Sequence, residues 1–228
     1  MKAYEYLATI PTFNSTDPIC VTRPAFLSSH SVILNIQESF NLFKFQHKYK
    51  ITSKCNKLSF KCRGKFVNPI CATKTLLDKN GNPIVRFWRD SSSLGSTFYV
   101  YDWETGRELC KFNTNAGRLL RLTLRVEFLD FITGRKRLLV LKGDWEKKEA
   151  LIFLGDPDEI KGGARLVAKI FRKPGLRRSD EYTVEIAANV DVAIVAILTI
   201  VFDTIKDNVQ IAMAIPNIPI PRLMSNAK

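Results

Sequence analysis

Residues 192–202 read VAIVAILTIVF and stand between two acidic residues, Asp191 and Asp203. As a helix, this stretch would carry apolar side chains on every side except at Thr199, so it would have to be enclosed by protein. Eleven residues span about 16 Å as a helix, roughly half of a ~30 Å bilayer core, which disfavours a membrane-spanning segment. Asp191 suits the N-cap position, because a carboxylate there accepts hydrogen bonds from the first N–H groups of the helix.

A buried strand is the alternative structure for this stretch, since Val and Ile are abundant in it. Its eleven residues exceed the roughly four to eight that are usual for a buried strand, so we expect a helix over about residues 190–205. Pro216, Pro219 and Pro221 come later and predict an extended tail over residues 208–228.

Upstream of the helix, from about residue 32 to residue 172, apolar and polar residues alternate with a period of two. The clearest run is LRLTLRVEF at residues 120–128. Such alternation predicts an antiparallel strand with one buried face, because successive side chains leave a strand on opposite sides. Shorter runs predict further strands at residues 49–52, 58–62, 84–88, 97–101, 108–112, 138–141, 150–154, 165–171 and 182–186.

Three loops between these runs share one turn signal, an Asp followed three or four residues later by Gly. Asp accepts hydrogen bonds from nearby backbone N–H groups and Gly adopts positive φ, so each pair predicts a hairpin turn. The pairs are Asp78 with Gly81, Asp102 with Gly106, and Asp130 with Gly134.

Many antiparallel strands followed by one wholly apolar helix can be packed in few ways, because the sheet must bury one face and the helix must be surrounded. We therefore expect a mainly β fold, a closed antiparallel β-barrel that encloses the C-terminal helix. The expected organisation is an irregular N-terminal arm over residues 1–30, the barrel domain over residues 31–207, and the tail over residues 208–228.

The chain carries 35 Lys and Arg against 22 Asp and Glu, a net charge of +13 that favours polyanionic partners such as nucleic acid or anionic lipid. Nine basic residues and no acidic residue lie between Ser39 and Leu77. Strand alternation there places basic side chains together on one face. Our candidates for anion binding are Lys48, Lys50, Lys61, Arg63, Lys65, Arg86 and Arg89.

Catalytic and metal signatures do not stand out in the sequence. The five cysteines form no C-x-x-C pair and only His30 and His47 accompany them, so we expect no metal, no cofactor and buried cysteines that fill apolar space. Neither histidine has a catalytic partner nearby in sequence, and no nucleotide-binding or nucleophile motif occurs, which favours a protein that is not an enzyme. The N-terminus lacks the apolar region of a secretory signal, so we expect reduced thiols and a cytoplasmic protein, with the nucleus as the other site.

The order of motifs over residues 32–207 resembles the tubby C-terminal-like superfamily, and within it the LURP-one-related proteins, relatives of the phospholipid scramblases. The motifs are YKITSK, LSFKCRG, TKTLLDKNGNPIVRF, STFYVYDWETGRELCKF, LKGDW, EALIFLG, ARLVAKIF and DEYTVEIAANVDVAIVAILTIVFD. The resemblance implies a barrel of about twelve antiparallel strands threaded by the C-terminal helix.

The resemblance says less about the ligand. Tubby domains bind phosphoinositides through a Lys-x-Arg pair, but here Arg86 and Arg89 have a different spacing and Asp90 follows them, so no phosphoinositide residue is carried over. The segment DTIKDN at residues 203–208 lacks the dense oxygen ligands of a calcium loop.

We expect a non-enzymatic barrel that binds anionic phospholipid headgroups, at the membrane periphery, or an acidic protein partner. The alternatives are nucleic-acid binding, with Phe43, Phe45 and Tyr49 as stacking residues, and phospholipid handling of the scramblase type. A scaffold without a ligand is a further possibility. The sequence does not indicate an oligomeric state.

Overall fold

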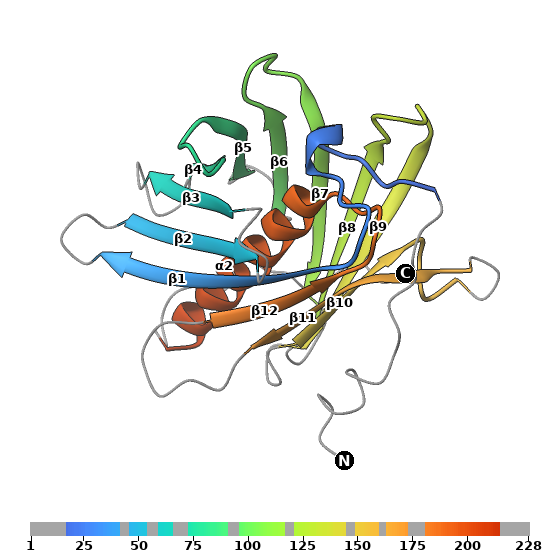
Figure 1. Cartoon of the computed structure of the whole chain (residues 1–228). Helices are drawn as coiled ribbons and strands as arrows, with labels where there is room; N and C mark the ends of the chain where they lie inside the picture. Colours follow the sequence, from blue (N-terminus) through green and yellow to red (C-terminus); the bar gives the residue numbers. More distant parts are fainter. Residues whose placement is uncertain are drawn as a thin grey trace.

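A closed antiparallel barrel of twelve strands surrounds one long helix in the computed structural model (Figure 1). The structure describes residues 17–41, 46–53, 59–65, 73–90, 96–116, 121–144, 149–159, 163–172 and 181–214. Each strand pairs with its neighbours in sequence, and β1 closes the barrel by pairing with β12. The strands are β1 (Val32–Asn41), β2 (Gln46–Ser53), β3 (Ser59–Lys65), β4 (Thr73–Leu77), β5 (Pro83–Asp90), β6 (Ser96–Asp102), β7 (Glu108–Ala116), β8 (Arg121–Leu129), β9 (Lys136–Asp144), β10 (Glu149–Leu154), β11 (Arg165–Arg172) and β12 (Glu181–Ile186).

The alternating pattern found in the sequence produces the two faces of the barrel wall. In β8, Leu122, Leu124, Val126 and Phe128 are buried, and the polar residues between them lie outside. The expected strands are present, and the fold class is confirmed. Strands β1 and β4 were not among the expected runs. In β1, the apolar Ile33 and the acidic Glu38 interrupt the alternation, and in β4 the charged Lys74 occupies a buried position.

The three expected Asp–Gly turns join β4 to β5, β6 to β7 and β8 to β9. Gly81, Gly106 and Gly134 all have positive φ, as this turn requires. Asp78 accepts hydrogen bonds from the N–H groups of Asn80 and Asn82, both at 2.8 Å. The turn signal therefore predicted both the position and the conformation of these hairpins.

The apolar stretch is a helix, α2 (Val192–Ala214), and residues 192–202 are completely buried inside the barrel. It continues beyond the expected end near residue 205, so residues 208–214 of the expected tail are helical. Gly143 of β9 makes room for the helix, because a Cβ atom there would lie 2.3 Å from the Phe202 ring. Within the described ranges, no helix combines the length and the apolar character needed to cross a bilayer.

The described part of the N-terminal arm crosses the end of the barrel where α2 begins, which we call the entry end (Figure 1). The arm contains a short 3-10 helix, η1 (Pro24–Phe26), and forms isolated bridges from Ile19 to Val190 and from Leu27 to Asp191. Ile19, Cys20 and Val21 are buried in the core. The described part of the arm, residues 17–30, is therefore an integral cover of the barrel.

Candidate functional site

Four of the predicted anion-binding residues form a block of cations on the outer wall, which we call the basic face. It consists of Lys48 and Lys50 on β2 and of Lys61 and Arg63 on β3. The register sets Lys48 opposite Arg63 and Lys50 opposite Lys61, and all four are exposed. The structure thus brings together side chains that the sequence placed on two neighbouring strands.

The strands on either side of the basic face offer no acidic partner in register. On β1, Gln37 pairs with Lys50 and Ser39 with Lys48. On β4, Leu77 pairs with Lys61 and Thr75 with Arg63. Like charges directly opposite each other destabilise a sheet, so a bound anion would relieve this repulsion.

The other three candidates are placed differently. Arg86 of β5 is exposed and belongs to the same outer wall, because Thr75 pairs with Arg63 on one side and with Arg86 on the other. Arg89 lies on the other side of β5, the side of the buried Val85 and Phe87. Burial lowers the pKa of Arg89 from its ordinary value. The side chain of Lys65 lies outside the described part of the structure.

An aromatic cluster continues the basic face across β5 and β6. The Trp88 and Tyr101 rings are stacked with centroids 4.7 Å apart, and Tyr99 lies 6.3 Å from Trp88. The guanidinium of Arg86 sits 5.2 Å from the centre of the Trp88 ring, at cation–π distance. The expected stacking residue Tyr49 is instead buried, and Phe43 and Phe45 lie outside the described residues.

Asp191 connects the helix to the N-terminal arm at the entry end. Its Oδ1 accepts hydrogen bonds from the N–H groups of Ala193 (3.0 Å) and Ile194 (3.3 Å), as expected of an N-cap. Its Oδ2 accepts three more, from the N–H of Val21 (3.0 Å) and from the N–H (2.6 Å) and Oγ1 (2.7 Å) of Thr22. Burial raises the pKa of Asp191, while the bonds from Thr22 act in the opposite direction.

Two further aspartates hold the arm from the hairpin turns. Asp102 accepts a hydrogen bond from Arg23 at 3.0 Å, and Asp130 accepts one from the N–H of Cys20 at 3.1 Å. Each also accepts hydrogen bonds from N–H groups of its own turn. Burial raises the pKa of both carboxyls, but the hydrogen bonds outweigh burial, so the pKa of each lies below its ordinary value.

We expect acid to weaken this attachment of the arm. A carboxyl whose pKa is lower in the folded state stabilises the fold above its unfolded pKa of about 3.9, and this stability is lost as the pH falls through the folded value. In urea unfolding, Asp102 and Asp130 should therefore contribute a loss of stability below about pH 4. Asp191, whose pKa is raised, contributes with the opposite sign, because protonation of this carboxyl favours the folded state. Asp102→Asn should reduce the loss of stability in acid, and an unchanged loss in this variant would contradict a contribution from Asp102.

A second buried polar network lies farther along α2. Asp203 accepts hydrogen bonds from Tyr182 (2.6 Å) and Tyr49 (3.2 Å). Lys74, only 4% exposed, donates to Thr204 and lies 5.2 Å from the centre of the Tyr49 ring. Burial, followed by Asp203, raises the pKa of Tyr49 well above its ordinary value, so this phenol remains a hydrogen-bond donor. The network thus connects the helix to the wall.

The described cysteines match the expectation of apolar filling. Cys20, Cys62 and Cys110 are free and buried. Burial raises the pKa of Cys20 and of Cys62 to about 12, so both stay as unreactive thiols. Among the described residues, no three His, Cys, Asp or Glu side chains are grouped closely enough to hold a metal ion.

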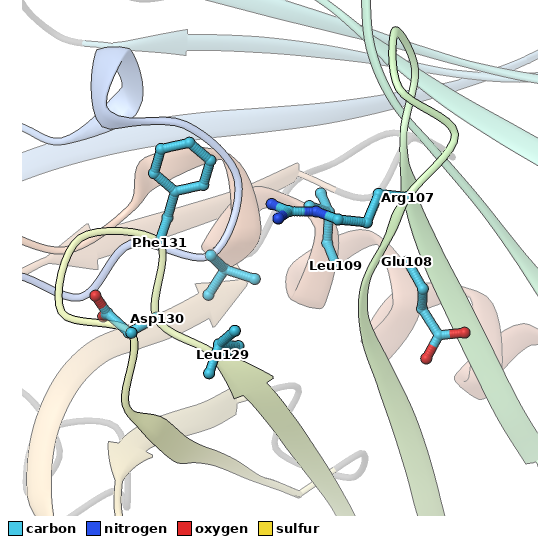
Figure 2. Close-up of a pocket in the computed structure, with 8 residues that line it drawn as sticks. Arg107, Glu108, Leu109, Leu129, Asp130 and Phe131 are labelled. Carbon is cyan, nitrogen blue, oxygen red and sulfur yellow. The ribbon is translucent and has the colours of Figure 1, made fainter.

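A pocket of about 300 Å³ opens at the entry end between the β6–β7 and β8–β9 hairpins (Figure 2). Apolar side chains of Val21, Leu109, Leu129 and Phe131 contribute to its lining. Arg107 reaches over it, and its guanidinium lies 5.8 Å from the centre of the Phe131 ring. Leu109 and the three residues of the aromatic cluster fall on expected strands, and Phe131 falls in an expected turn. Neither this pocket nor the aromatic cluster was predicted, because both depend on which strands and hairpins lie side by side.

Comparison with known proteins gives a family and a fold. The family model described as LURP-one-related matches residues 32–203. An X-ray structure of a protein from Arabidopsis thaliana has a TM-score of 0.55 and 21% identity, covering 81% of this chain and 97% of that chain. At this identity the likeness shows the fold alone. No significant relative is found among curated proteins.

Proposed function

The chain belongs to the LURP-one-related family, and from this premise we propose that it binds anionic phospholipid headgroups through its basic face. The tubby-like fold of this family is generally non-catalytic. In this function the protein is a cytoplasmic one that associates reversibly with membrane surfaces. No chemical step is required of it, since the proposed ligand is bound and not transformed.

The observation that carries this proposal is the block of Lys48, Lys50, Lys61 and Arg63 with neutral residues in register on both sides. Each cation near an anionic bilayer contributes about 1 kcal/mol to binding. Three effective contacts would give about 3 kcal/mol, or roughly a hundredfold in partition. This attraction is large enough to recruit the protein and small enough to remain reversible.

Nucleic acid is the second candidate ligand, and the aromatic cluster favours it. Bases stack on exposed aromatic rings, and Trp88, Tyr99 and Tyr101 are partly exposed beside the cations. Stacking between Trp88 and Tyr101 already uses one face of each of these rings, however. Trp and Tyr are also the residues enriched at the level of lipid headgroups, so the cluster suits a bilayer as well.

We expect charge reversal on the basic face to remove vesicle binding. The variant Lys61→Glu/Arg63→Glu should bind vesicles of phosphatidylcholine and phosphatidylserine in equal parts at least thirtyfold more weakly, because each reversal costs ~1 kcal/mol or more. Vesicle flotation at low salt measures this partition. Both residues are exposed on the outer wall, so the variant should fold normally.

The control is Lys142→Glu/Arg165→Glu, which reverses two charges on β9 and β11, at least three strands from β2 and β3 around the barrel. Lys142 pairs with Asp158 at 2.5 Å, so the stability of this variant is measured beside its binding. This control should retain most of the binding. Equal loss in both variants would indicate attraction by net charge alone and would contradict the basic face as the site. Displacement of the protein from vesicles by a single-stranded oligonucleotide at lower concentration would instead favour nucleic acid.

A further inference from the structure

Four large apolar side chains are exposed at the entry end, and we call them the apolar crown. They are Trp103, Leu129, Phe131 and Ile132, with exposed fractions of 48%, 57%, 50% and 48%. They lie on or beside two neighbouring hairpin turns, β6–β7 and β8–β9. Exposed apolar residues gathered on one end of a protein indicate a contact surface.

The fold holds these turns in fixed positions. Asp102 accepts hydrogen bonds from the N–H groups of Glu104 and Thr105, at 3.0 and 2.8 Å. Asp130 accepts equivalent bonds from Ile132 and Thr133, at 3.1 and 2.9 Å. The N–H of Phe131 also donates to the carbonyl of Cys20, at 2.8 Å. The exposure of the crown is therefore built into the structure and incurs little ordering cost on binding.

Exposed charge beside the crown is largely positive. Arg135 and Lys136 follow Phe131 and Ile132 in the same hairpin, and Arg107 lies against the Phe131 ring. Among the acidic groups nearby, Glu104 pairs with Arg23 at 3.2 Å. Glu108 accepts a hydrogen bond from the neutral hydroxyl of Tyr101 at 3.1 Å and keeps its charge, so the three exposed cations outnumber it. Apolar side chains with cations beside them suit the boundary between acyl chains and anionic headgroups.

The crown and the basic face are linked by the strand register. Lys61 pairs with Leu77, and Leu77 pairs with Pro83. The N–H of Trp103 donates to the carbonyl of Ile84, the residue next to Pro83. Lys61 and Trp103 therefore lie along one row of the wall, three strands apart, a separation of about 15 Å at the usual strand spacing.

We propose that the apolar crown enters the interfacial region of an anionic bilayer, with Arg107, Arg135 and Lys136 at the level of the lipid phosphates. This inference rests on the proposed function and adds to it the part of the protein that penetrates the membrane. Convex hairpin tips suit a deformable bilayer better than a rigid protein surface. The pocket between the tips, with its apolar lining and Arg107 above it, offers space for part of an acyl chain beneath a headgroup (Figure 2).

Trp103 is a direct reporter of this insertion. In the variant Trp88→Phe/Trp145→Phe it is the sole tryptophan of the chain. We expect its emission to shift to shorter wavelength when vesicles of phosphatidylcholine and phosphatidylserine are added, and nitroxide groups placed just below the headgroups should quench it. An unchanged emission while the protein floats with the vesicles would overturn the inference and leave the proposed function intact.

Removal of apolar area from the crown gives an independent test in the native tryptophan background. Phe131→Ser/Ile132→Ser should weaken vesicle binding about tenfold to hundredfold. The variant no longer gains the free energy of moving these two half-exposed apolar side chains from water into the bilayer. The loss should persist at high salt, which screens the basic face. The control Ile33→Ser/Leu151→Ser changes partly exposed apolar residues of β1 and β10 and should bind normally.

The two proposals fail in different ways. Loss of binding only in Lys61→Glu/Arg63→Glu, with the crown variant unaffected, would overturn insertion but not headgroup binding. Absence of vesicle binding by the native protein would overturn both. A Trp103 shift caused by raising the protein concentration without vesicles would show that a second copy covers the crown, and this too would overturn the inference.

Discussion

Replacement of Asp191 by alanine is expected to lower the free energy of unfolding by about 4 kcal/mol or more. Its carboxylate accepts five hydrogen bonds at the entry end, where it is completely buried. Alanine would leave the N–H groups of Val21 and Thr22 without their acceptor, and each such buried group costs about 1–3 kcal/mol. The loss of the N-cap adds about 1 kcal/mol. Urea unfolding followed by tryptophan fluorescence measures the change.

A loss of this size is a large fraction of the ~5–15 kcal/mol that stabilises a typical domain, so milder variants keep the test informative. Thr22→Val removes one donor to Asp191 and should cost about 1 kcal/mol. Asp191→Asn retains one side-chain oxygen and should fall between Thr22→Val and Asp191→Ala. If the free energy of unfolding of Asp191→Ala lies within about 1 kcal/mol of the native value, this carboxylate does not hold the arm and the helix together.

Replacement of Gly143 by alanine is the second change with a large expected effect, about 2–3 kcal/mol of destabilisation. The new Cβ would lie 2.3 Å from Cε2, 3.0 Å from Cδ2 and 3.2 Å from Cζ of Phe202. The ring is buried between the helix and the wall, so relief requires the helix or the ring to move within a closed barrel. Thermal and urea unfolding of purified protein measure the loss.

The clash predicts a specific rescue. Phe202→Leu alone should destabilise the core because it leaves a cavity. In the double variant, leucine makes room for the new methyl group, so the combined loss should be smaller than the sum of the single losses by about 1 kcal/mol or more. Additive losses would mean that Gly143 is needed for its backbone freedom and not for its contact with Phe202.

The fold was predictable because its main determinants are local in sequence. Alternation in residues 120–128 gave the two faces of β8, and Asp–Gly spacing gave the hairpins. The unbroken apolar stretch after Asp191 predicted an enclosed helix, because a helix with apolar side chains on every face must be surrounded by protein. The helix end was less predictable, because Asp203 bonds to Tyr182 inside the barrel instead of closing the helix.

The candidate site was predictable only in part, because it depends on pairing between distant segments. Alternation within β2 and β3 gave the side on which Lys48 and Lys61 lie, but not the register that sets the cations in opposing pairs. The same alternation separates Arg86 from Arg89, since three positions along a strand reverse the face. Phe131 and Ile132 read as turn residues, and only the assembled hairpins show them as part of one exposed surface.

The pairing of β1 with β12, which closes the barrel, can form only late in the synthesis of the chain. Its closing strands β1 and β12 come from opposite ends of the domain, and Val21 must meet Asp191 across 170 positions of sequence. A ribosome delivers the chain from its N-terminus at about 5–20 residues per second, so eleven strands emerge before the last strand and the helix that fills their interior. During this interval the inner, apolar face of the unclosed sheet is exposed in the nascent chain. We therefore expect folding of the nascent chain to depend on chaperones until α2 has been translated.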